Sequence, residues 1–153
     1  MSDFTFEFLD AFEFAELMAA APDVVESEIT TATDRVAIYG MGVSIRNTPV
    51  DKGHLRRSHA QMPTSYSAGV ATGGWGNATP YAEAVEKGRR GFSASPGKML
   101  AFTPKGSNQL IFRKSVGPAA AQPFMEPGRE AAESRMDAEF SGAITRIVEA
   151  LGG

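Results

Sequence analysis

The chain has 153 residues, 42% of them apolar and 22% charged, a size and composition typical of one globular domain spanning residues 1–153. It has no cysteine, which excludes a disulfide framework, a thiolate zinc site and a cysteine nucleophile. No run of about 18 apolar residues is present, so we expect neither a membrane-spanning segment nor a membrane partner.

The net charge of −3 conceals an uneven distribution along the chain. Residues 1–51 carry ten acidic and two basic side chains, residues 52–114 carry two acidic and ten basic, and residues 115–153 carry six acidic and three basic. A basic middle between acidic ends suits two kinds of partner: a nucleic acid, or an acidic protein surface such as that of another copy.

The N-terminal region combines two short patterns. Phenylalanines alternate with other residues over 4–8, which favours a strand with one buried face, although Phe8 and Phe12 also have helical spacing. Good helix formers at helical spacing follow and predict a short helix that Pro22 ends.

Residues 23–48 carry the pattern of a long helix. Asp23 and Glu26 stand in the relation of a capping box, and Pro49 disfavours helical geometry at the residue before it. The predicted apolar face consists of Val25, Ile29, Ala32, Val36, Gly40 and Val43.

Glycines mark the end of this helix and the turn beyond it. Gly40 and Gly42 indicate either the close approach of another backbone or a frayed last turn. Asp51, Lys52 and Gly53 predict a turn in which the glycine takes a positive φ.

Two hairpins are predicted in the middle of the chain. Residues 58–64 and 67–75 form the first around Ser65, with Pro63 suited to an edge or a bulge. The second pairs two short apolar runs, 99–103 and 109–113.

The remaining elements complete the fold class. Residues 81–86 predict a helical turn or two that Gly88 ends, and 88–98 is rich in glycine, serine and proline, as in an exposed mobile loop. A last helix runs from about residue 124 or 127 to Leu151. The prediction is an α+β domain: an antiparallel β-sheet with the long central helix and the C-terminal helix packed on one face, and a protruding loop and hairpin over 88–118.

Nothing in the sequence points to catalysis, a metal or a cofactor, so we do not expect an enzyme. His54 and His59 are five residues apart, which places them on opposite faces of a strand, and no carboxylate lies between them. We expect two solvated loop histidines. No P-loop, nucleophile elbow or zinc-protease motif is present.

The basic residues give a stronger signal. Three pairs, Arg56–Arg57, Arg89–Arg90 and Arg113–Lys114, fall in predicted loops or strand ends. They belong either to an ordinary solvated surface or to one face on which all three converge. Such a face would contact phosphates without reading bases, or the acidic helices of a neighbouring copy.

Three motifs resemble those of the tail-completion, or head–tail joining, proteins of long-tailed double-stranded DNA phages. The first is P-V-D-K-G-H-L-R-R-S at 49–58, with Lys52 where the family usually has threonine. The second is Tyr81-Ala82 followed by Val85, Glu86 and Gly88. The third is Pro123-Phe124-Met125 followed by Pro127, with Gly128 where alanine is usual.

The resemblance implies a non-catalytic structural protein of the phage neck or tail, assembled in the host cytoplasm and located in the virion. It implies a homo-oligomeric ring whose partners are the tail terminator and the head-completion (stopper) or portal-adaptor proteins. DNA in the bore is a possible non-specific contact. The alternative function is a non-specific nucleic-acid-binding module using residues 52–114.

The opposed charges suggest how such a ring forms. We expect acidic helices of one copy to face basic loops of the next, a heterologous contact that closes into a ring. The candidate interface residues are Asp51, Lys52, Gly53, His54, Leu55, Arg56, Arg57, Arg89, Arg90, Phe92, Arg113, Lys114, Glu26, Glu28 and Asp34.

Overall fold

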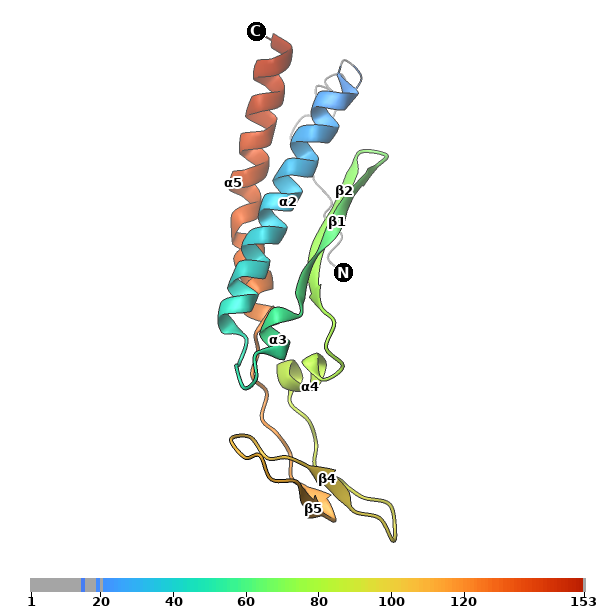
Figure 1. Ribbon diagram of the computed structural model, residues 1–153. Helices are drawn as coiled ribbons and strands as arrows, with labels where there is room; N and C mark the ends of the chain where they lie inside the picture. Colours follow the sequence, from blue (N-terminus) through green and yellow to red (C-terminus); the bar gives the residue numbers. More distant parts are fainter. Residues whose placement is uncertain (1–14, 16–18, 20, 153) are drawn as a thin grey trace.

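The computed structural model describes residues 15, 19 and 21–152. The strand expected at 4–8 and most of the short helix expected after it lie outside these residues. The α+β class is confirmed: two long helices pack against each other, and antiparallel strands accompany them. The molecule is elongated, with the helices at one end and a β-rich projection at the other (Figure 1).

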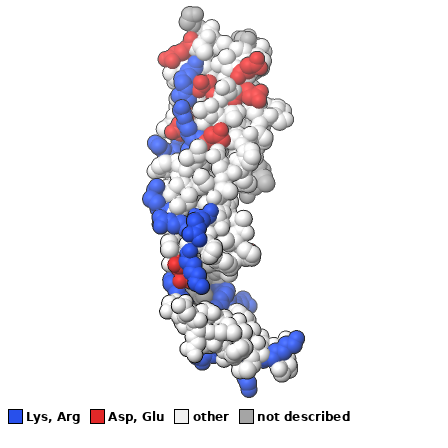
Figure 2. Space-filling view, viewed as in Figure 1, with Lys and Arg blue, Asp and Glu red and all other residues white. Residues whose placement is uncertain are grey.

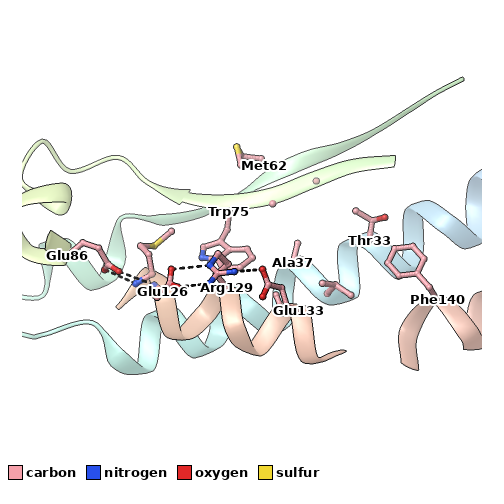
Figure 3. A pocket seen from close by; sticks show the side chains of 14 residues that line it. Thr33, Ala37, Met62, Trp75, Glu86, Glu126, Arg129, Glu133 and Phe140 are labelled. Atoms are coloured by element: carbon pink, nitrogen blue, oxygen red, sulfur yellow. Dashed lines mark hydrogen bonds and ion pairs between the residues drawn. The ribbon is translucent and has the colours of Figure 1, made fainter. Parts of the chain in front are cut away.

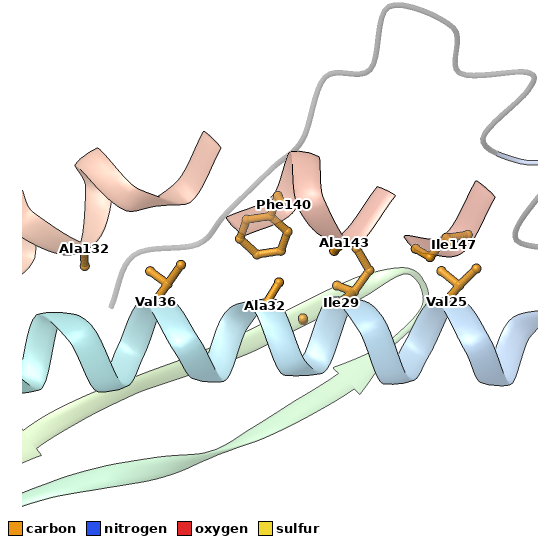
Figure 4. Close-up of a cluster of buried hydrophobic side chains, with 9 residues drawn as sticks. Val25, Ile29, Ala32, Val36, Ala132, Phe140, Ala143 and Ile147 are labelled. Carbon is orange, nitrogen blue, oxygen red and sulfur yellow. The ribbon is translucent and has the colours of Figure 1, made fainter. Parts of the chain in front are cut away.

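The core lies mainly between α2 (Pro22–Asn47) and α5 (Met125–Gly152). Both helices present apolar residues every three or four positions, and these faces meet along most of their length (Figure 4). The buried cluster contains Val25, Ile29, Ala32, Val36, Ala71, Ala132, Phe140, Ala143 and Ile147.

The ends of α2 show one wrong prediction and one confirmed. Pro22 begins α2, since its fixed φ suits the first helical position, and residue 21 before it is not helical, as expected of a helix boundary at Pro22. The capping box is wrong: Ala21 is the N-cap, and no side chain among the described residues caps this end. Thr48 has the extended backbone expected of the residue before Pro49, and α2 ends there.

Gly40 is a point of close approach, so the first of the two alternatives for this glycine holds. A Cβ atom at Gly40 would lie 2.7 Å from Cζ3 of Trp75 and 2.9 Å from the Cβ of Ala132. At Gly42 the Cβ would meet only the end of the Arg46 side chain, at 3.7 Å. Helix α2 therefore needs glycine at the first position and not at the second.

The first hairpin differs from its prediction in its turn. Strands β1 (His59–Ser67) and β2 (Val70–Asn77) are joined by Ala68 and Gly69, both with positive φ, so the turn expected at Ser65 is wrong. A register shift between Met62 and Ser65 confirms the irregularity expected at Pro63. The two strands are paired on both sides of this irregularity, so the hairpin continues past Ser65. The hairpin packs on α2, and we call α2, α5 and β1–β2 the body.

A short helix, α3 (His54–Arg57), precedes the first hairpin and was not predicted. It follows Gly53, whose φ of 77° confirms the turn expected there. Helix α4 (Ala82–Lys87) ends at Gly88, as the sequence predicts.

The projection consists of residues 88–118, which we call the arm. Strand β3 (Phe92–Ser93) pairs with β6 (Ser115–Val116), and β4 (Leu100–Phe102) pairs with β5 (Ile111–Arg113), the hairpin expected there. The described strands thus form three separate two-stranded antiparallel sheets and not one continuous sheet. The arm extends beyond the N-terminal end of α5 (Figure 1).

Candidate interaction surfaces

Glu86 joins the second motif to the third. Its carboxylate accepts hydrogen bonds from the backbone N–H groups of Phe124 (2.7 Å), Met125 (2.8 Å) and Glu126 (3.0 Å). These groups begin α5 and have no partner within the helix, and a negative charge is favourable at a helix N-terminus. Glu86 therefore fixes where α5 starts and how it meets α4.

Gly88 and the backbone around it complete this joint. A Cβ atom at Gly88 would lie 2.8 Å from both the Ala119 oxygen and the Ala121 nitrogen, so no side chain fits. The Gln122 N–H donates to the Val85 oxygen at 2.8 Å. The segment that leaves the arm is thereby held against the segment that enters it.

His59 lies between α2 and the start of α5. Its Nε2 is 2.8 Å from Oγ1 of Thr48, and its ring meets the buried Phe124 edge to face at 5.5 Å. Burial lowers the pKa of His59. The expectation of two solvated histidines is therefore wrong for His59, whereas His54 is exposed at the start of α3.

The first motif lines a cavity of about 280 Å³ whose other walls come from the second motif and the arm. Leu55 is buried, and its carbonyl oxygen accepts a hydrogen bond of 2.7 Å from Nδ2 of Asn77. The lining residues are Pro49, Val50, Asp51, Lys52, Gly53, His54 and Leu55, together with Tyr81, Val85, Lys105 and Gln122. The three motifs are thus brought together, and several of their residues act in holding the chain in shape.

A second cavity, of about 370 Å³, lies between α2, the first hairpin and the N-terminal half of α5, and we call it the groove (Figure 3). Trp75 forms part of its wall and is fixed by a hydrogen bond of 3.0 Å from Nε1 to Oγ of Ser44. The described lining residues are Thr33, Val36, Ala37, Met62, Gly73, Gly74, Trp75, Glu86, Met125, Glu126, Arg129, Ala132, Glu133 and Phe140. Most of this lining is apolar, and its charged side chains come from α4 and the first turns of α5.

The polar part of the groove is an ion-pair cluster on α5. Arg129 donates to Glu126 at 3.0 Å through Nε and also pairs with Glu133. The hydrogen bond to Glu126 is the main cause that raises the pKa of Arg129, and the same bond lowers the pKa of Glu126. With Glu86 nearby, the groove carries three carboxylates and one guanidinium.

The arm has a different surface. None of its residues, all of which the structure describes, is buried. Four of its large apolar side chains, Phe92, Met99, Leu110 and Phe112, stand at least half exposed, whereas Leu100, Phe102, Ile111 and Val116 are partly buried. It contains six basic residues and no acidic one.

Two of the three basic pairs lie along one ladder of the arm but at different ends of it. Arg89 pairs with Ala119 at the base of the ladder, and Lys114 pairs with Ala94 beyond the β3–β6 strands, so Arg89–Arg90 and Arg113–Lys114 do not meet. The Arg89 guanidinium also lies 5.1 Å from the centre of the Phe92 ring. Arg56 and Arg57 lie apart from them, in α3.

Two of the three acidic candidates on α2 are engaged within their own chain. Glu28 pairs with Arg146 at 2.6 Å, and Asp34 accepts hydrogen bonds from Gln61 (2.9 Å) and Thr64 (2.6 Å). Glu26 is exposed. On the face in Figure 2 acidic side chains gather over the helices, and the arm shows only basic ones.

Neither a metal site nor a membrane span is found in the described part of the chain. No group of three or more His, Cys, Asp or Glu residues there could hold a metal ion. None of the helices over 21–152 combines the length and apolar character needed to cross a bilayer.

In comparisons with known proteins, no family model, curated protein or solved structure matches this chain.

Proposed function

We propose that the chain is a structural protein of the neck of a long-tailed double-stranded DNA phage, located in the virion. Copies arranged in a ring would complete the tail and join it to the capsid. The partners are the tail terminator and the head-completion or portal-adaptor proteins. No step of this role requires catalysis or a cofactor.

The observation that carries the proposal is the junction of the three motifs. The first motif shares a cavity with Tyr81 and Val85 of the second. Glu86 of the second binds the backbone at Phe124 and Met125 of the third. Three short matches that arose by chance would have no reason to meet, whereas motifs of one family are expected to form one structural unit.

The arm supports an assembly role. Its exposed apolar side chains include Phe112, which is 58% exposed, and Met99, which is 55% exposed. A concentration of large apolar side chains on a surface marks an interaction site. Because the arm has no core of its own, contacts with neighbouring proteins would order and bury it.

An in vitro joining experiment tests the proposal. In the phage that encodes the chain, an amber codon at Gln61 should yield filled heads and free tails that do not join. Adding the purified protein to that lysate should restore joined particles and infectivity. Tailed, infectious particles formed at normal yield without the protein would refute the role.

The alternative is a non-specific nucleic-acid-binding module, which is favoured by the six basic and no acidic residues of the arm. Filter binding with duplex DNA at increasing salt separates the two functions. A module of this kind loses affinity steeply as salt rises, because bound counterions are released from phosphates. A double variant, Arg113→Gln with Lys114→Gln, should then flatten that dependence, and a neck protein whose arm binds protein should show little affinity at physiological salt.

A further inference from the structure

We infer that the arm of one copy docks into the groove of the next. The inference rests on the proposed ring and specifies the contact by which the ring would form. The partner for the arm is therefore a second copy of this chain.

The arm has the composition of an inserted element. Phe112 and Leu110 stand at the β5 side of the hairpin, and both are more than half exposed. Arg113 and Lys114 follow directly. Aromatic residues and Arg, such as Phe112 and Arg113 here, are enriched at protein interfaces.

The groove has the complementary character. Its walls include Trp75, Met62 and Phe140, and its volume of about 370 Å³ falls in the range of specific binding pockets. Its charged groups are Glu86, Glu126 and Glu133 against Arg129 alone. An arm with six positive charges and no negative one therefore meets a site with an excess of carboxylates, and such complementarity guides the register of a complex.

The contact is directed to another copy because the arm is held away from its own groove. The Arg89 and Ala119 backbones exchange two hydrogen bonds of 2.9 Å at its base. Gly88 packs so closely on the returning segment that a Cβ atom there would lie 2.8 Å from the Ala119 oxygen and the Ala121 nitrogen. The β4–β5 hairpin then projects beyond the N-terminal end of α5, on the far side of α4 from the β1–β2 hairpin (Figure 1).

One patch on each copy thus meets a different patch on the next. Contacts of this heterologous type generate closed rings when the rotation between copies closes. The arm and the groove lie in different parts of each molecule, so a copy that gives its arm to one neighbour keeps its groove open for the other.

Cysteine cross-linking tests the contact directly, since the natural chain has no cysteine. One preparation carries Ala101→Cys, which faces Phe112 across the β4–β5 pair and keeps the anchor. The other carries Met62→Cys in the groove wall. Mixed at high concentration with a short bismaleimide, they should form a cross-linked pair that mass spectrometry assigns to residues 101 and 62.

The matched control replaces the groove cysteine with Val148→Cys, an exposed apolar position near the C-terminal end of α5. Its cross-linking to residue 101 should be at least about tenfold weaker, the factor expected when contact depends on one specific site. Equal yields at positions 62 and 148, or cross-links only between two arms, would overturn the inference.

Sedimentation separates failure of this contact from failure of the ring. Leu110→Asp should weaken self-association by about tenfold or more, and Val148→Asp should leave it unchanged. Rings that persist unaltered in Leu110→Asp would refute arm-to-groove docking and leave the proposed ring intact. A wild-type chain that stays monomeric at high concentration and also fails to join heads to tails would refute both.

Discussion

The body and the arm hold their shapes by different means. Every buried apolar residue of the described chain lies in the body or directly beside it, from Val25 to Ala71 and from Phe124 to Ile147. The arm, between them in sequence, has backbone ladders and no buried side chain. A region without a core adds little to the free energy of unfolding, and its exposed apolar residues are the ones proposed above to make contacts outside the molecule.

This difference predicts that changes of similar size have opposite effects in the two regions. Substitutions in the body should alter the free energy of unfolding and thereby change assembly only indirectly. Substitutions in the arm should leave that free energy almost unchanged and alter assembly directly. The experiments below test this division, beginning with the largest effect.

The closest contact between α2 and α5 should be the most sensitive point. A Cβ atom at Gly128 would lie 2.6 Å from the Gly40 carbonyl oxygen and would also overlap Oγ of Ser44. Gly128→Ala must therefore push the helices apart, and we expect a loss of about 3 kcal/mol in the free energy of unfolding. Urea denaturation measures it.

Gly42→Ala provides the control for that experiment. It also adds a Cβ to a helix of the body, but meets only the flexible end of Arg46, at 3.7 Å. The better helix propensity of alanine should leave stability unchanged or raise it by up to about 1 kcal/mol. Equal losses in both variants would contradict the close packing of α2 on α5.

The joint between the regions should be the next most sensitive. Glu86→Ala removes the acceptor of three backbone N–H groups at the start of α5, and we expect a loss of about 1–2 kcal/mol. Glu83→Ala on the same helix removes only an exposed pair with Lys87, which solvent screens, so its effect should be much smaller. Parallel urea titrations compare them, and a Glu83 loss as large as that of Glu86 would contradict the capping role.

The sequence predicted the long elements well because each has a periodic apolar face. The end of α2 before Pro49, the pairing of β4 with β5 and the last helix are confirmed. Short-range features were less predictable. Helix α3 has only four residues, and it depends on burial of Leu55 and on a contact with Asn77, which lies 22 positions away.

The candidate site was less accessible to sequence reasoning than the fold. The groove is lined by residues from distant segments, which leave no common spacing in the sequence. Nothing in the sequence around Glu86 indicates that it binds the start of α5, which lies about 40 residues further along the chain. Glu28 and Asp34 were expected to face a neighbour, yet each binds a partner far along its own chain.

His59 predicts a pH dependence that belongs to the body alone. Its ring lies against Phe124 and Thr48, and its Nδ1 is buried without a hydrogen-bond partner among the described residues. Since burial lowers the pKa of His59 below 6.5, the unfolded chain binds a proton more readily. The free energy of unfolding should be unaffected above pH 6.5 and should fall as the pH drops below it.

Urea titrations between pH 5 and pH 8 check this dependence, with His59→Gln and His54→Gln compared with the natural chain. The His59→Gln variant should lose the part of the decline between about pH 6.5 and pH 5 that comes from His59. His54→Gln should keep that decline, because His54 is exposed in α3. An identical decline in the natural chain and in His59→Gln would contradict the assignment.

The smallest effect on stability is expected in the arm. Phe112→Ser removes a ring that is 58% exposed and touches no core, so the free energy of unfolding should change by less than about 0.5 kcal/mol. The same change at the buried Phe124 should cost at least about 3 kcal/mol, because it leaves a cavity in the body. If Phe112→Ser were as destabilising as Phe124→Ser, the arm would have a core contribution of its own. Its exposed apolar surface would then need another explanation than docking.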